Sequence, residues 1–197
     1  TQPQGRDFDY FRLVFAFYRG LRRLGLNVDI LPPDVADLSG YRLLLAPGVA
    51  TLSDALLAAL ATFQGTALIG PRSNAKTVEF ATPVPLPPNL PGLDAVVARV
   101  ESLPPDVPVP LERGGNLLHW REKIEGTATV VERATDGWPV LLRAGGLHYL
   151  AGWPEDVVLD RMLADLCAGQ GIETDHLPEG LRRRDSDTHR FWFNYNP

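Results

Sequence analysis

Residues 18–47, YRGLRRLGLNVDILPPDVADLSGYRLLLAP, decide the fold of this chain. The stretch begins in a helical pattern that ends near Leu24, and two short apolar segments follow, Asn27–Leu31 and Arg42–Ala46. Both segments are bounded by Gly or Pro, which is typical of buried parallel strands. We therefore expect a helix, a strand, a loop and a second strand in this order.

The next segments extend the same pattern. Ser53 can cap a helix that runs to about Phe63, and Thr66–Ile69 is an apolar segment typical of a third strand. Strands separated by helical or crossover segments favour a parallel sheet with helices on its faces. The sequence thus predicts an α/β domain whose sheet is mostly parallel.

The helix expected at Asp9–Leu24 has more apolar surface than one sheet can cover. One side carries Leu13, Val14, Phe17, Leu21 and Leu24, and another carries Phe11, Phe15 and Tyr18. A helix packed on a single sheet needs an apolar arc of little more than about 100°. The second side is therefore covered either by loops of the same chain or by a subunit or domain interface, and the sequence leaves both possibilities open.

The second half of the chain combines strands with proline-rich connectors. Proline fixes φ and lacks a backbone donor, so ATPVPLPPNLPG and LPPDVPVP are expected to be connectors rather than helix interiors or central strands. The pair Asp136-Gly137 indicates a hairpin turn. The other expected elements are strands at Val96–Glu101, Thr127–Ala134, Trp138–Arg143 and Leu147–Ala151, a helix at Pro154–Ala168, and a hairpin of Leu181–Arg184 with Arg190–Tyr195.

Composition and charge exclude several classes of protein. A chain of 197 residues that is 45% hydrophobic can bury roughly 70% of its unfolded surface, which suits one domain with a small appendage. Its net charge of −5 provides no broad positive field, so we expect neither nucleic acid nor a membrane as a partner. The single cysteine, Cys167, excludes an internal disulfide and fits a reducing compartment such as the cytoplasm. The polar start is no signal peptide, and we expect Thr1 to mark a cut or a processing event.

One segment is similar to a phosphate-binding loop. Residues 70–77, GPRSNAKT, follow an expected strand and match G-x-x-x-x-G-K-T except that Ala75 replaces the second glycine. The departure matters because the loop needs the backbone freedom of glycine at that point, and Pro83 follows too soon for a long helix. We therefore expect no nucleotide and no other cofactor. Arg72 and Lys76 are instead candidates to pair with carboxylates across a subunit contact, or they are solvated.

We expect no nucleophile and no metal site in this chain. An amidotransferase of the cysteine type needs its nucleophile on a tight turn between strand and helix, whereas Cys167 lies late in an amphipathic helix and is expected to be a buried thiol. The turn after Arg42–Ala46 offers no strong nucleophile. No two of the four histidines have the spacing of a helical metal pair. They are His119, His148, His176 and His189.

Glycosidase chemistry is not expected in this chain either. A retaining mechanism needs two carboxyl groups about 5–5.5 Å apart. The glutamates are expected in loops or on the polar side of alternating strands, among them Glu79, Glu101, Glu112, Glu122, Glu125 and Glu132. Three tryptophans could stack on a sugar, but a core or interface role is expected for Trp120, Trp138 and Trp153.

The pattern YRGLRRLGLNVDILPP with the following LSGY carries a family resemblance, which continues through QPQGRDFDYFRLVF, GPRSNAKTVEF, RVESLPP, HYLAGWPEDVVLDRMLADL, LPEGLRRRD and RFWFNYNP. These segments cover nearly the whole chain, which resembles the middle, trimer-forming domain of family 42 glycoside hydrolases, the bacterial β-galactosidases. The resemblance implies a non-catalytic α/β domain that follows a catalytic barrel. It places the acid/base and nucleophile glutamates of the parent enzyme in that barrel, so we assign no catalytic residue to this chain.

Together these observations predict a three-layer α/β domain, flavodoxin-like or class I glutamine amidotransferase-like, with a mostly parallel sheet and a short C-terminal β-hairpin. Residues 1–176 are expected to form this domain, and residues 177–197 to begin a truncated β-domain. The candidate subunit interface consists of Phe11, Phe15, Tyr18, Arg72 and Lys76.

The resemblance implies that the domain joins three copies of a cytoplasmic, retaining β-galactosidase. That parent enzyme hydrolyses terminal non-reducing β-D-galactose residues and binds the galactoside mainly in its barrel. One alternative is a stand-alone amidotransferase-like or other small-molecule-binding α/β domain without the catalytic cysteine. Another is an enzyme for a different glycoside, such as an arabinoside.

Overall fold

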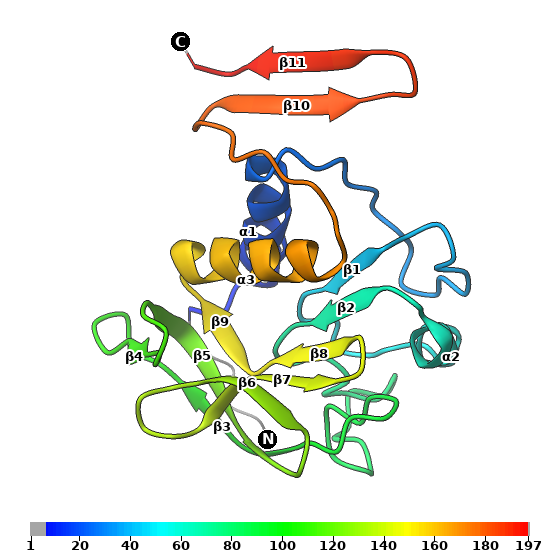
Figure 1. Cartoon of the computed structure of the whole chain (residues 1–197). Coiled ribbons are helices and arrows are strands. Elements are labelled where there is room, and N and C mark those ends of the chain that lie inside the picture. Colours follow the sequence, from blue (N-terminus) through cyan, green and yellow to red (C-terminus); the bar gives the residue numbers. More distant parts are fainter. Residues whose placement is uncertain (1–6, 197) are drawn as a thin grey trace.

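The computed structural model describes residues 7–196, and Figure 1 shows its elements. In chain order they are α1 (Tyr10–Arg23), β1 (Leu43–Ala46), α2 (Asp54–Thr62), β2 (Thr66–Ile69), β3 (Val96–Ser102), β4 (Val109–Pro110), β5 (Asn116–Glu125), β6 (Thr129–Arg133), β7 (Pro139–Ala144), β8 (Leu147–Leu150), β9 (Gly152–Pro154), α3 (Asp156–Gly169), β10 (Leu181–Asp185) and β11 (Arg190–Asn194). The fold is mixed α/β. No helix within residues 7–196 is long and apolar enough to cross a membrane.

The main sheet is mixed rather than mostly parallel, so that prediction is wrong. Its strand order is β1-β2-β8-β7-β6, in which β1, β2 and β8 are parallel neighbours while β8, β7 and β6 are antiparallel neighbours. Tight turns cause the change of direction. Gly145 and Gly137 both have positive φ, at the turns that join β7 to β8 and β6 to β7. Strands joined by such short turns must pair antiparallel.

The segment Asn27–Leu31 was predicted as a buried strand, and this is wrong. The structure leaves it irregular, and the side chain of Ile30 is 88% exposed. The side-chain amide of Asn27 donates to the backbone oxygen of Asp185 (2.7 Å) and accepts from its N–H (3.1 Å). The segment is therefore tied to β10 by a side chain instead of joining the sheet.

The main sheet is covered on both faces, as the alternation along β2 shows. Leu68 points into a hydrophobic cluster with Phe17 of α1 and Met162 of α3. Its neighbour Ile69 points into a second cluster with Leu56 of α2. Successive residues of a strand face opposite sides of the sheet, so α1 and α3 cover one face and α2 covers the other. The apolar sequence of β2 predicted this burial correctly.

A second, antiparallel sheet forms around β5, a strand that was not predicted. Its order is β3-β5-β4, and β9 also pairs with β5. The strand escaped recognition because its alternation is broken at His119, which has φ of 56°, and because the charged run Arg121–Lys123 follows. Trp120 of β5 nevertheless lies in the first hydrophobic cluster and Ile124 in the second.

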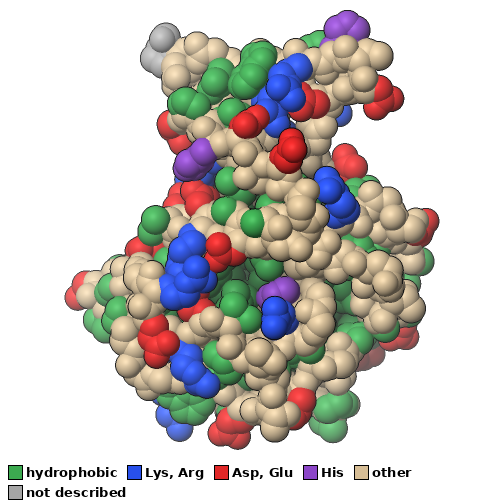
Figure 2. Space-filling view, viewed as in Figure 1, with side chains coloured by type: hydrophobic (Ala, Val, Ile, Leu, Met, Phe, Trp, Pro, Cys, Tyr) green, Lys and Arg blue, Asp and Glu red, His purple; other side chains and the backbone are tan. Residues whose placement is uncertain are grey.

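The predicted C-terminal hairpin forms from β10 and β11 and projects from one end of the molecule, at the top of Figures 1 and 2. Arg183 of β10 is buried and bonds to the carboxylate of Asp175 and to the backbone oxygen of Gly25 (3.2 Å). Arg22 of α1 donates in turn to the backbone oxygen of Arg183 (2.7 Å). These contacts attach the hairpin to the C-terminal end of α1.

Candidate functional site

The second apolar side of α1 is exposed, and we call the surface of Phe11, Phe15 and Tyr18 the aromatic face. Their exposed fractions are 80%, 56% and 38%, whereas Leu13 and Phe17 on the opposite side are fully buried. Loops within residues 7–196 therefore leave the aromatic face uncovered. Aromatic residues are enriched in protein–protein interfaces, so this surface suits a protein partner.

The helix presents this face in a fixed orientation. Asp9 caps its start by accepting from the N–H of Arg12 (3.2 Å), as the predicted start of the helix implied. Arg19 pairs with Asp156 of α3 (2.5 Å), and Arg23 pairs with Asp160 (2.5 Å). The two pairs hold α1 against α3.

The two other predicted interface residues lie in the loop after β2. The backbone N–H of Asn74 donates to Val49 (2.9 Å), and that of Lys76 donates to Ala50 (2.9 Å). Arg72 and Asn74 have φ of 63° and 52°, a left-handed conformation that residues other than glycine adopt rarely. Two of the N–H groups that a phosphate-binding loop would offer thus bond within the chain. Lys76 lies partly exposed at the end of this loop.

Arg72 is half-buried and packs against its own chain. Its guanidinium carbon lies 4.5 Å from the ring centroid of Phe8 and 4.8 Å from that of Trp120. A guanidinium over an aromatic ring contributes roughly 0.5–2 kcal/mol. The structure therefore places Arg72 in an aromatic cluster rather than free in solvent, and its pairing across a subunit contact stays a prediction.

Beside Arg72 lies a buried carboxyl group whose predicted position was wrong. Glu122 was expected in a loop or on the polar side of a strand, but it is only 2% exposed. Its carboxyl oxygens accept from the N–H of Arg72 (2.9 Å), Nε1 of Trp120 (3.3 Å) and the hydroxyl of Tyr149 (2.5 Å). The sequence did contain one sign of this burial. Trp120 and Glu122 are two residues apart, and this spacing puts both on one face of a strand.

Burial controls the protonation of Glu122 and Tyr149. It raises the pKa of Glu122, because the charged form loses its hydration, and the three donors only partly oppose this effect. The pKa of Tyr149 is raised well above its ordinary value by burial and by the neighbouring Glu122. Both oxygens of Glu122 already have donors from the chain, so the arrangement fixes the loop after β2 onto β5 and β8. It leaves neither carboxyl oxygen of Glu122 without a hydrogen-bond partner.

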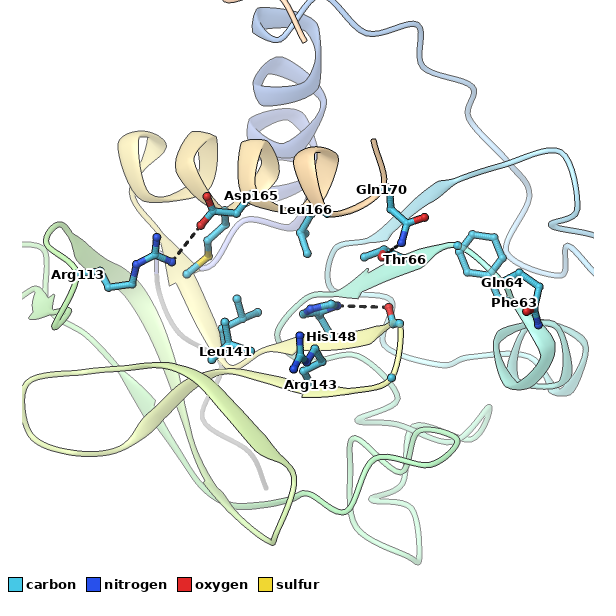
Figure 3. A pocket seen from close by; sticks show the side chains of 16 residues that line it. Phe63, Gln64, Thr66, Arg113, Leu141, Arg143, His148, Asp165, Leu166 and Gln170 are labelled. Carbon is cyan, nitrogen blue, oxygen red and sulfur yellow. Dashed lines mark hydrogen bonds and ion pairs between the residues drawn. The ribbon is translucent and has the colours of Figure 1, made fainter. Parts of the chain in front are cut away.

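A pocket of about 570 Å³ opens between α3 and the strands β2, β7 and β8 (Figure 3). Figure 2 shows a histidine and basic side chains gathered at this hollow. Burial lowers the pKa of His148, whose Nδ1 lies 3.3 Å from the oxygen of Gly146, so its ring favours the neutral form. Gln170 donates to Thr66 (2.8 Å) across the pocket. These groups offer hydrogen bonds to a small polar molecule, although the hydroxyl of Thr66 is already bonded to Gln170.

Several residues that were considered as catalytic or sugar-binding candidates are packed in the core. The predicted burial of Cys167 is confirmed, and this burial raises the pKa of its thiol. Trp120 and Trp153 are buried, and the ring of Phe8 packs edge-on against both, with centroids 5.7 and 5.3 Å away. Among residues 7–196, no group of three or more His, Cys, Asp or Glu side chains could hold a metal ion.

Comparisons with known proteins agree on one family. A family model described as the β-galactosidase trimerisation domain matches residues 1–173. A β-galactosidase of Thermus thermophilus is 41% identical over 207 residues, which cover 100% of this chain and 31% of the relative. A β-galactosidase of Halorubrum lacusprofundi is 31% identical over 215 residues, which cover 92% of this chain and 30% of the relative.

Solved structures give the same result. The crystal structure of a β-galactosidase from the psychrophilic Marinomonas ef1 superimposes with a TM-score of 0.93 at 35% identity, over 98% of this chain and 30% of that chain. The structure of a β-galactosidase from Halorubrum lacusprofundi follows with a TM-score of 0.87 at 28% identity, over 98% of this chain and 32% of that chain. The chain thus spans about a third of the length of the relatives it matches.

Proposed function

We propose that this chain, which belongs to the family of β-galactosidase trimerisation domains, joins three copies of a longer β-galactosidase polypeptide. The proposed contact uses the aromatic face of α1. The activity in this proposal is that of the relatives, because the β-galactosidases of Thermus thermophilus and Halorubrum lacusprofundi contain a matching segment. Hydrolysis of terminal β-D-galactosides with retention then belongs to a barrel outside this chain. The domain contributes assembly rather than catalysis.

The exposure of Phe11, Phe15 and Tyr18 carries this proposal. Fully burying a phenylalanine side chain contributes roughly 1.5–3 kcal/mol, so a surface of this kind gains substantially from a partner. The rings of Phe15 and Tyr18 lie side by side, with planes 21° apart and centroids 6.3 Å apart, so one partner surface can cover both.

The division of the chain supports a multidomain parent. We propose that residues 1–176 form the trimerisation domain and that residues 177–197 begin a β-domain. The exposed Phe191, Trp192 and Phe193 of the projecting hairpin support this boundary, because three adjacent aromatic side chains favour further cover by protein.

Two finer points complete the proposal. The parallel strands β1, β2 and β8, with helices on both faces, support a flavodoxin-like or amidotransferase-like origin for this half of the domain. The single cysteine supports a cytoplasmic location for the enzyme, because such compartments keep thiols reduced.

Sedimentation of the complete polypeptide that contains this chain tests the assembly. We expect a trimer, and Phe15→Asp should shift it toward monomer because a charge would be buried in the contact. Ile30→Asp is the matched control, since Ile30 is also highly exposed but lies outside α1, and it should leave the trimer intact. Circular dichroism checks that both variants fold. A monomeric unmodified polypeptide would contradict the proposal.

A further inference from the structure

A second exposed apolar surface lies on the connector that follows β2. We call residues 77–88 the Phe80 loop. Val78 is 75% exposed and Phe80 is 80% exposed, and Val84 and Leu86 of the same loop are exposed as well. Connectors on a protein surface are normally polar, so four exposed apolar side chains on one loop indicate a contact with another protein surface.

The tip of the loop is ordered by its own hydrogen bonds. The N–H of Thr77 donates to the oxygen of Ala81 (3.0 Å), and the N–H of Phe80 donates to the oxygen of Thr77 (2.9 Å). Phe80 has φ of 60°, which bulky residues adopt rarely. The tight turn made by these hydrogen bonds leaves the ring of Phe80 in water, since nothing within residues 7–196 covers it.

The base of the loop is also fastened. The side-chain amide of Asn74 donates to the oxygen of Pro88 (3.1 Å), and the hydroxyl of Thr51 donates to the oxygen of Lys76 (2.9 Å). The two ends are thereby held to the body of the domain. An ordered loop loses little conformational entropy when it binds a partner.

The Phe80 loop and the border of the aromatic face carry opposite charges. Glu79 lies between Val78 and Phe80, is exposed, and makes no ion pair within residues 7–196. Arg12 follows Phe11 on α1, about 100° further round the helix, so it lies at the border of the aromatic face. It is exposed and likewise makes no ion pair in that range. A contact between the loop and the aromatic face would bring these two opposite charges near each other.

Threefold symmetry uses two different surfaces wherever the contact lies away from the axis. In a closed ring of three copies, each such contact joins one patch of a subunit to a different patch of its neighbour. Only a patch on the axis itself meets its own copies. The Phe80 loop lies on a different element from the aromatic face and has the complementary charge, which makes it the candidate for the matching half.

We propose that the Phe80 loop of one copy docks on the aromatic face of the next copy, with Glu79 facing Arg12. The inference rests on the proposed trimer and identifies its second surface. Apolar contacts supply most of the binding free energy, and the charge pair fixes which surfaces meet.

A charge-swap experiment on the complete polypeptide tests the docking. Glu79→Arg and Arg12→Glu each place like charges together, which should raise the concentration at which the trimer half-dissociates by at least about tenfold. The double variant restores opposite charges and should return this concentration to within about threefold of the unmodified value. Phe80→Ser should weaken the trimer as well, and Glu112→Arg, at another exposed glutamate, should not. Analytical ultracentrifugation over a dilution series measures all five variants.

The outcomes separate this inference from the proposed function. If Phe15→Asp dissociates the trimer while Glu79→Arg and Phe80→Ser leave it intact, the trimer stands and the Phe80 loop is not its second surface. If both single charge variants weaken the trimer but the swap does not restore it, the two residues do not face each other and the proposal is overturned. If Phe80→Ser lowers only the melting temperature, the loop packs on another domain of its own chain, which also overturns it.

Discussion

The two sides of α1 are almost equally apolar but differ completely in their surroundings. Leu13 and Phe17 are enclosed by α3 and the sheet, whereas Phe11 and Phe15 point into water. An apolar stripe on a helix therefore does not by itself show what covers it. The chain covers the first stripe itself, and we propose that another subunit covers the second stripe.

The largest effect is expected on the enclosed stripe at Phe17, which is 1% exposed. Phe17→Ala removes a ring from the cluster of α1 and α3, and the resulting cavity should cost about 3–5 kcal/mol of unfolding free energy. Urea denaturation of the 197-residue chain measures this loss. An effect below about 1 kcal/mol would show that the enclosed stripe contributes no more than a surface position.

An intermediate effect is expected where α1 is fixed to α3. Asp160→Asn removes the charged partner of Arg23, which is almost fully buried, and should cost roughly 1.5–3 kcal/mol because a charged hydrogen bond is lost. The same denaturation experiment measures it, with Asp165→Asn in an exposed pair as the control. Equal losses in the two variants would contradict the enclosed position of Arg23.

The contrast between enclosed and exposed groups also predicts a pH dependence. The folded pKa of Glu122 is raised above its unfolded value of 4.5, so the folded state binds the proton more tightly. This contribution to stability is fully present below the unfolded pKa and is lost as the pH rises through the folded pKa. We expect Glu122→Gln to remove this fall of the unfolding free energy with rising pH. We expect Glu79→Gln, at an exposed residue, to leave it unchanged. Denaturation curves from about pH 4 upward measure both, and identical slopes for all three proteins would refute the assignment.

The smallest effect is expected on the exposed stripe. Phe15→Ala removes a ring that the chain itself leaves exposed, so the unfolding free energy of the monomeric chain should change by less than about 0.5 kcal/mol. The measurement uses denaturation at a concentration low enough to avoid association. A loss comparable to that of Phe17→Ala would place Phe15 in the core and remove the distinction between the two stripes.

Much of the fold could be predicted because local rules decide it. The helix start at Asp9, the cap by Ser53, the half-buried strand β1, the buried strand β2 and the terminal hairpin all follow from residues that are neighbours in sequence. The hairpin of β6 and β7 was predicted from the turn at Asp136-Gly137 and is confirmed. Its place in the main sheet was not predicted, since the order of strands depends on contacts between distant segments.

The misplaced features share a physical cause. Asn27–Leu31 is apolar enough for a strand, but its neighbour is β10, far away in sequence, which no local pattern reveals. Glu122 lies in a charged run, and only the fold brings the donors of Arg72 and Tyr149 to it. The sequence likewise could not show that the aromatic face is exposed. Helical periodicity identifies an apolar side of a helix but not the segment or subunit that packs on it.

Photocrosslinking from Phe15 would show directly whether the aromatic face joins subunits. The complete polypeptide would carry benzoylphenylalanine in place of Phe15, and equal amounts of isotopically light and heavy subunits would be exchanged before irradiation. We expect crosslinks between light and heavy chains, which mass spectrometry would locate in residues 77–88 of the neighbour. Crosslinks confined to single chains would show that the aromatic face is covered by its own polypeptide and would contradict its role in assembly.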